Sequence, residues 1–93
     1  MKTITAKLIF IMPQVHSLKE KRMIARELID KTRHKYKVSI AEVGTQDVHQ
    51  TLTLGIAVVS GEYFHARKVM DEIIGYVERN AVAELISVEK EEY

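Results

Sequence analysis

The chain has 93 residues, the size of one domain, so we expect a single domain over residues 1–93. Hydrophobic residues make up 46% of it, well above the level of a disordered chain. The absence of cysteine excludes disulfides, zinc–thiolate sites and cysteine nucleophiles. No apolar run approaches the roughly 18 residues of a membrane span, and the run 8–13 is too short for a signal peptide. We therefore expect a cytoplasmic protein without a membrane partner.

The net charge of +1 hides an uneven distribution along the chain. Residues 1–40 carry ten Lys or Arg against three Asp or Glu, whereas residues 41–93 carry four against ten. Such asymmetry is typical of a protein whose basic side binds nucleic acid or another anion. It is also compatible with two solvated faces of opposite sign that attract each other or a second copy.

Hydrophobic periodicity predicts four strands and two helices, because strands alternate every second residue and helices repeat every 3.6. Pro13 ends the first strand, and Ser17 with Glu20 forms a capping box that starts the first helix. The second helix starts at Ser60 or Gly61, and Asn80 is a suitable stop for it. The predicted strands are residues 3–12, 36–43, 51–60 and 82–89, and the predicted helices are residues 18–35 and 61–80.

The resulting order, β-α-β-β-α-β, predicts an α+β fold of the ferredoxin-like, split β-α-β type. Four antiparallel strands in the order 4-1-3-2 form one sheet, and two helices cover one of its faces. In this topology the loop after the first strand (residues 13–17) and the loop after the second (residues 44–50) lie at the same end of the sheet. The start of the first helix lies at that end too.

The first helix carries the candidate binding residues. A helix start offers free N–H donors and a partial positive charge, which suit phosphate, and the cations further along form one stripe beside the apolar face. The i,i+4 spacing allows Arg26 to pair with Asp30 and Glu27 with Lys31. The alternative to an anion site is an ordinary charged solvent face. We predict that the anion- or RNA-binding residues are Ser17, Lys19, Lys21, Arg22, Arg26 and Arg33.

The loop after the second strand is the other candidate segment. Gly44 permits a positive φ at a turn, and Gln46 and Asp47 can cap backbone groups there. A purely structural turn explains these residues as well. Because the topology places this loop beside the start of the first helix, we predict a composite polar site formed by both segments.

Histidine offers a weaker alternative. His16 and His49 fall at the same end of the sheet as Asp47, where a two-His, one-carboxylate metal site is conceivable, although no helical i,i+4 ligand pair supports it. His34 and His65 belong to the other end. An enzyme that uses Asp47 with His16 or His49 as acid–base groups is the weakest hypothesis, and we expect no catalytic residues, metal or cofactor.

Known signatures narrow the function further. The chain has no GxxxxGK[ST], GxGxxG or GxSxG motif. Acylphosphatases share this strand order, and they use an arginine in the first loop and an asparagine on the third strand. Neither residue is present at these places here, which argues against acyl phosphate hydrolysis. RNA-recognition motifs stack bases on aromatic residues of the sheet, and residues 51–60 contain none.

The sheet face opposite the helices is apolar for a surface exposed to water, which usually marks a partner interface. We predict a homodimer that packs sheet on sheet; edge-strand pairing and a different partner are the alternatives. The predicted interface residues are Ile9, Ile11, Val43, Ala57 and Val59, with Ala41 beside them.

Four segments resemble the YlxP-like family of small bacterial proteins of unknown function: SLKEKR at residues 17–22, AEVG at 41–44, Gln46-Asp47, and LGIAVVS at 54–60. The resemblance covers almost the whole chain and implies a ferredoxin-like fold. Genes of this family often lie beside genes for translation initiation and ribosome maturation factors, which implies a role near RNA or the ribosome. The family has no established catalytic residues, so none is carried over.

Together, these observations favour a non-catalytic RNA- or ribosome-associated accessory protein that contacts phosphates through a basic helix. The alternative is a homo-oligomeric binding or regulatory module that recognises a small anion or a protein partner.

Overall fold

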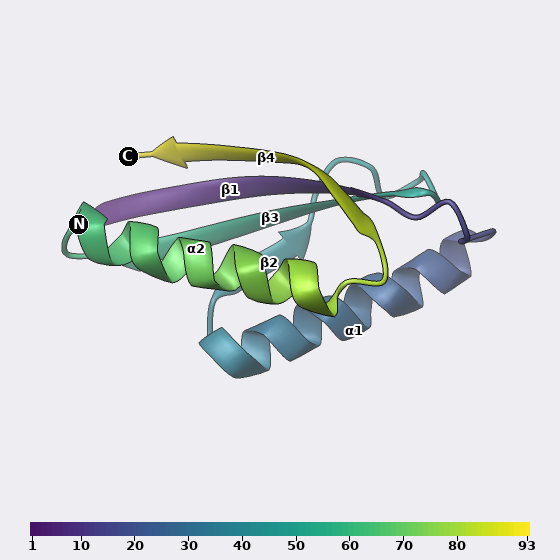
Figure 1. Ribbon diagram of the computed structural model, residues 1–93, viewed down its shortest axis with the longest axis horizontal. Coiled ribbons are helices and arrows are strands. Elements are labelled where there is room, and N and C mark those ends of the chain that lie inside the picture. The colour runs from purple at the N-terminus through teal and green to yellow at the C-terminus, as the bar shows by residue number, and fades with distance from the viewer.

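Four strands and two helices form in the predicted order, and the computed structural model describes all of residues 1–93. The strands make one antiparallel sheet in the order β2-β3-β1-β4, so the predicted ferredoxin-like α+β fold is confirmed. Figure 1 shows both helices on one side of the sheet and both chain ends at the same end of it. The elements are β1 (Lys2–Ile11), α1 (Leu18–Tyr36), β2 (Ser39–Glu42), β3 (Thr51–Ser60), α2 (Tyr63–Asn80) and β4 (Glu84–Glu92).

The core lies between the sheet and the helices. Strands β1 and β3 pair over ten residues, from Lys2 opposite Ser60 to Ile11 opposite Thr51, and their alternate side chains point toward the helices. Full burial of one such side chain as large as Leu8 or Phe10 stabilises the fold by roughly 1.5–3 kcal/mol. The buried hydrophobic residues of the two strands are Ile4, Ala6, Leu8, Phe10, Leu52, Leu54, Ile56 and Val58.

The end of α1 differs from the prediction. The alternation of Tyr36, Val38 and Ile40 predicts a strand from residue 36, but α1 continues through Tyr36. The Tyr36 ring packs edge-on against Tyr76, with ring centroids 5.4 Å apart. Lys37 then ends the helix in the left-handed conformation (φ 52°) and donates its N–H to the carbonyl of Arg33. A tertiary contact therefore outweighs local alternation, and β2 is short.

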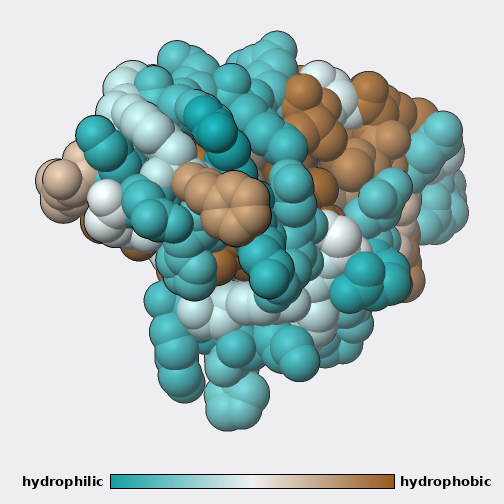
Figure 2. Space-filling view, turned by 60° about the vertical axis from the view of Figure 1, so that its left-hand side comes forward, coloured by the Kyte–Doolittle hydropathy of each residue, from teal (hydrophilic) through white to brown (hydrophobic).

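The start of α2 also differs. Ser60 lies opposite Lys2 as the last residue of β3, so the helix begins at Tyr63 rather than at Ser60 or Gly61. It ends at Asn80, as predicted. Neither helix of the structure has both the length and the apolarity that a membrane-spanning helix needs. Most of the surface seen in Figure 2 is hydrophilic, and apolar side chains gather in a patch at its upper right.

Strand β4 is shifted toward the C-terminus relative to the prediction and runs to Glu92 instead of ending at residue 89. Two ion pairs tie its acidic end to α2: Lys90 Nζ lies 2.7 Å from an oxygen of Asp71, and Arg67 Nε lies 2.7 Å from Glu92 Oε2. Hydrophobic periodicity does not predict this end of β4, because its contacts with α2 are made by charged side chains.

Candidate nucleic-acid interface

The loop after β1 and the loop after β2 meet at one end of the sheet, as the topology predicts. The Met12 N–H donates to the carbonyl of Gln50 at 2.8 Å. The Gln50 side chain donates in turn to the carbonyls of Pro13 (3.0 Å) and Val15 (3.3 Å). These contacts place residues 44–50 beside the segment that leads into α1.

The start of α1 is capped as its sequence predicts. Ser17 has an extended backbone, and its hydroxyl oxygen accepts a hydrogen bond from the Glu20 N–H at 3.1 Å. The Glu20 carboxylate accepts from the His16 N–H at 3.3 Å, one residue earlier than a regular capping box requires. Ser17 therefore satisfies the helix itself, and its side chain remains exposed at the N-terminal end of the basic stripe.

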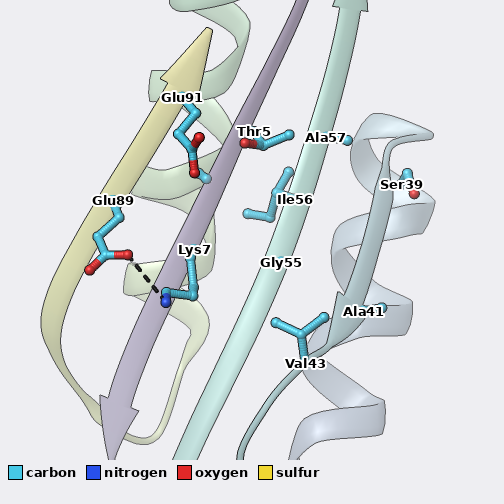
Figure 3. A pocket seen from close by; sticks show the side chains of 11 residues that line it. Thr5, Lys7, Ser39, Ala41, Val43, Gly55, Ile56, Ala57, Glu89 and Glu91 are labelled. Carbon is cyan, nitrogen blue, oxygen red and sulfur yellow. Dashed lines mark ion pairs between the residues drawn. The ribbon is translucent and has the colours of Figure 1, made fainter. Parts of the chain in front are cut away.

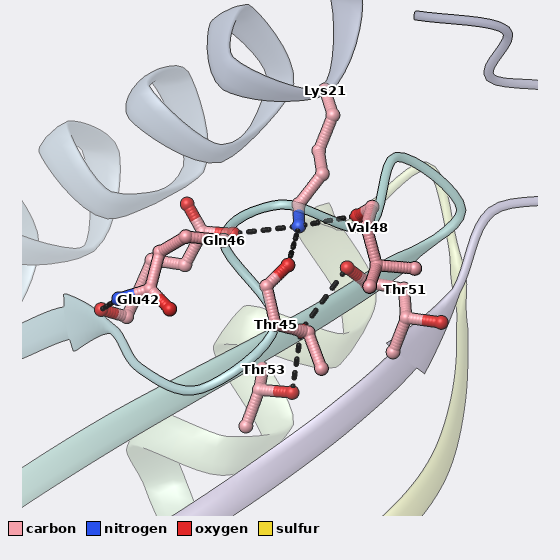
Figure 4. A network of polar contacts seen from close by, with 7 residues as sticks. All are labelled: Lys21, Glu42, Thr45, Gln46, Val48, Thr51 and Thr53. Atoms are coloured by element: carbon pink, nitrogen blue, oxygen red, sulfur yellow. Dashed lines mark hydrogen bonds and ion pairs between the residues drawn. The ribbon is translucent and has the colours of Figure 1, made fainter. Parts of the chain in front are cut away.

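Lys21 does not face solvent, so the prediction that it contacts an anion is wrong. The residue is fully buried, and its ammonium group donates to the carbonyls of Thr45 and Val48, the latter at 2.6 Å. Glu42 Oε2 lies 2.8 Å from Nζ, within ion-pair distance, but in a geometry that makes no hydrogen bond. Figure 4 shows the Lys21 side chain reaching from α1 to the loop after β2. Lys21 thus holds this loop against the helix.

A signal for this burial is present in the sequence. Lys21, Ala25, Leu28 and Thr32 are spaced by four, three and four residues, which is one row of an α-helix, and they are the buried residues of α1. The charge of Lys21 conceals its place in this row. The length of a lysine side chain allows the ammonium group to pass the core and reach the loop carbonyls.

The loop itself is a structured turn. Gly44 has φ 84°, which confirms the predicted positive φ, and the Gln46 side chain donates to the carbonyl of Glu42 at 3.4 Å. The Thr45 hydroxyl lies 2.8 Å from the hydroxyl of Thr53, a polar contact that sequence reasoning missed. Asp47 is exposed. Most polar groups of the loop form hydrogen bonds within the loop or to neighbouring residues of the protein. We therefore expect the loop to shape the surface beside α1.

The other four predicted cations, Lys19, Arg22, Arg26 and Arg33, are exposed along α1. No carboxylate lies within 4.0 Å of any of their charged nitrogens, and the Arg26–Asp30 and Glu27–Lys31 pairs that the i,i+4 spacing allows do not form. Arg33 donates to the carbonyl of Ile40 on β2 at 2.7 Å. The cations of the stripe therefore form no ion pairs, although Glu27 and Asp30 line the same surface.

A shallow groove runs between α1 and β2. Three arginines and Asp30 line its helix side together with Ala25 and Ile29, and Ala41 and Glu42 form the strand side. The arginines are Arg22, Arg26 and Arg33. The backbone N–H and C=O groups of successive residues in β2 point alternately toward β3 and away from it. Those of Val43, just after β2, point toward β3, because its N–H donates to the carbonyl of Thr53. Ile40 and Glu42 consequently direct their backbone groups into this groove.

The histidines do not form a site with Asp47. His16 is exposed and His49 is half-buried, and no three His, Asp or Glu side chains lie close enough together to share a metal ion.

Shifted pKa values occur where α2 packs against β4 and at the C-terminus, away from the stripe. Arg67 hydrogen-bonds Glu92 through two nitrogens, both at 2.7 Å. This hydrogen bonding lowers the pKa of Glu92 and raises the pKa of Arg67. The hydrogen bond from the Tyr93 hydroxyl to Glu91 raises the pKa of Tyr93.

The uncovered sheet face is less apolar at its centre than its sequence suggests. Figure 3 shows a trough whose floor includes Gly55 and Ala57, with Val43 on one side and the Lys7–Glu89 ion pair (3.2 Å) on the other. Val59, 63% exposed, lies toward one end of this face. The remaining predicted interface residues, Ile9 and Ile11, lie toward the other end and are half-buried.

Comparisons with known proteins agree with this fold. The model of the family described as "Protein of unknown function (DUF503)" matches residues 3–90. The "Uncharacterized protein YlxP" of Bacillus subtilis (strain 168) is 34% identical over 62 residues, which are 67% of each chain. A de novo designed protein with a ferredoxin fold superposes with a TM-score of 0.54 at 16% identity, covering 98% of this chain and 83% of that one. SnoaB, a cofactor-independent oxygenase from Streptomyces nogalater, gives 0.52 at 9% identity, covering 98% and 90%.

Proposed function

This chain belongs to the DUF503 family of proteins of unknown function, and we propose that it is a non-catalytic accessory protein that binds RNA or the ribosome. The observation that carries the proposal is the stripe of Lys19, Arg22, Arg26 and Arg33, exposed on α1 and without ion-pair partners. Permanently charged donors of this kind hold phosphate groups.

Electrostatics supports an anionic ligand at this stripe. Arg22 and Arg26 are separated by one helical turn, and like charges at this spacing destabilise a helix by about 0.2–0.5 kcal/mol. The cations nearest the start of α1 also have the wrong sign for the helix dipole. A bound phosphate chain would relieve both costs.

The dimensions fit several consecutive phosphates. Lys19 and Arg33 are 14 residues apart, so the stripe spans roughly 21 Å at 1.5 Å per residue. One strand of a regular duplex places a phosphate about every 3.4 Å along its axis, so about six phosphates pass along this length. Four contacts to such a chain are sterically reasonable.

Salt dependence tests the proposal. Four phosphate contacts predict a slope of log K against log salt of about −3.6 for a duplex and −2.8 for a single strand. Between 50 and 200 mM salt, binding should weaken by roughly 50- to 150-fold. The measurement is fluorescence anisotropy with labelled RNA, repeated by co-sedimentation with isolated ribosomal subunits. Salt-independent binding, or none at 50 mM, would refute the proposal.

Charge reversal locates the site. The double variant Arg22→Glu/Arg26→Glu should lose most RNA affinity at low salt. The matched control is Lys68→Glu/Arg79→Glu, which changes the net charge equally at exposed positions of α2 that make no ion pair. Equal losses in the two double variants would show that net charge alone drives binding, and the stripe would then not be the site.

The exposed Val59 favours a second candidate function, a homo-oligomeric binding or regulatory module that pairs through the uncovered sheet face. Val59→Asp should then reduce the mass in solution measured by light scattering, whereas Phe64→Asp, at another exposed apolar position, should leave it unchanged. An unchanged mass in the Val59 variant would exclude this interface.

A further inference from the structure

We infer that the stripe on α1 recognises double-stranded RNA in preference to single-stranded RNA, an inference that rests on the proposed function. Its basis is the combination of a row of cations at regular positions on one helix with the lack of a freely exposed aromatic side chain on that helix.

The helix fixes the spacing of the backbone positions that carry these cations. The buried row of α1 lies beside the stripe and anchors the helix, and Lys21 in that row binds the loop after β2. Arg33 is held by its hydrogen bond to Ile40 on β2. A duplex presents its phosphates at regular positions before binding, so cations at regular helix positions meet it without ordering of the ligand.

A single strand gains its affinity differently. Its bases are unstacked, and proteins that bind single strands supply aromatic side chains on which successive bases stack. The ligand must also be ordered on binding, a cost that stacking normally offsets. A site without a stacking surface therefore disfavours single strands.

The aromatic side chains lie elsewhere or are already occupied. Phe10 is buried, and Tyr36, the one aromatic residue of α1, packs against Tyr76. The Tyr63 ring lies under two cations, with Lys2 at 5.1 Å and Arg67 at 5.4 Å from its centroid. Two aromatic residues are exposed: Phe64 on α2, and Tyr93 at the C-terminus.

The surroundings of the stripe also favour recognition by shape. The groove beside it is lined by Ala25, Ile29 and Ala41 in addition to arginines and acidic residues. Apolar side chains make no hydrogen bonds to base edges, whereas the arginines can contact phosphates. Double-stranded RNA is recognised mostly through its backbone and shape in this way. We therefore expect little dependence on base sequence.

The test compares an RNA duplex of about 20 base pairs with each of its separated strands, per nucleotide and in the same buffer. With four contacts and equal affinities of the two ligands at 1 M salt, the steeper slope of the duplex makes its binding about sixfold tighter at 100 mM salt and about elevenfold tighter at 50 mM. A preference of at least about fivefold for the duplex at 100 mM, with the steeper salt slope, is the expected result. Equal or tighter binding of the single strands would overturn the inference.

The Arg22→Glu/Arg26→Glu variant separates this inference from the proposed function. If single strands bind as tightly as the duplex and this variant abolishes binding to both, the stripe binds RNA but the duplex preference is wrong. If neither ligand depends on these arginines, the proposed function fails as well. Far-UV circular dichroism of the variant checks that its total helix content is unchanged.

Discussion

Replacement of Lys21 by methionine tests the central contact of the site. Methionine has a similar length and is apolar, so the change removes the ammonium group with little change in packing volume. It leaves the carbonyls of Thr45 and Val48 and the carboxylate of Glu42 without their partner. Breaking a buried ion pair from one side costs about 3–5 kcal/mol. The Glu42 side chain is 16% exposed and can be partly hydrated, so we expect a loss of about 3 kcal/mol.

A loss of this size is a large part of the total stability, which for 93 residues is roughly 5–14 kcal/mol. In urea unfolding followed by far-UV circular dichroism, the midpoint should fall by roughly 2–3 M if the slope is about 1–1.5 kcal/mol per M. The melting temperature should fall by roughly 12–24 °C. The control Lys19→Met makes the same chemical change at an exposed position of α1 and should alter stability by less than about 0.5 kcal/mol.

A double-mutant cycle makes the reasoning refutable in detail. Lys21→Met/Glu42→Leu removes both charges, so it should recover part of the stability lost in Lys21→Met, with a coupling of about 1 kcal/mol or more. A Lys21→Met protein within about 1 kcal/mol of the native stability would show that the buried ammonium group is not what holds the loop.

Three further predictions concern the backbone and the acidic strand. Gly44→Ala should cost about 1–2 kcal/mol because φ is 84° there, whereas Gly61→Ala, whose added carbon meets nothing within 4 Å, should be nearly neutral; equal urea midpoints would contradict this. Lys37→Gly should raise the unfolding free energy by about 0.5–1 kcal/mol, because glycine adopts the left-handed conformation (φ 52°) without strain, and a lower melting temperature would refute it. The folded pKa of Glu92 lies below its unfolded value, so the Arg67–Glu92 pair stabilises the protein above the usual glutamate range and loses this effect as pH falls through the lowered pKa. Glu92→Gln should consequently weaken the acid dependence of the melting temperature, and an unchanged profile would show that this pair contributes nothing.

Residue types and the strand order of the fold predict much of the site. The capping role of Ser17, the positive φ of Gly44 and the meeting of the two loops follow from local chemistry and strand order, and the structure confirms them. The burial of Lys21 was missed because a charged side chain normally marks solvent, although its spacing placed it in the buried row. The Arg26–Asp30 pair that the i,i+4 spacing allows does not form, and exposed pairs of this kind are weak.

The sequence by itself determined the fold class, the strand order and the core face of the sheet, because alternation, helical repeat and chain connectivity are local or nearly local properties. Only the tertiary structure decided where α1 ends, how far β4 extends and which cations remain free. These depend on contacts between residues far apart in the chain: Tyr36 with Tyr76, Lys90 with Asp71, and Lys21 with the loop after β2. A charged side chain is free to bind a ligand only if it makes no such contact within the protein. The sequence alone does not show which distant residues come within hydrogen-bond or ion-pair distance.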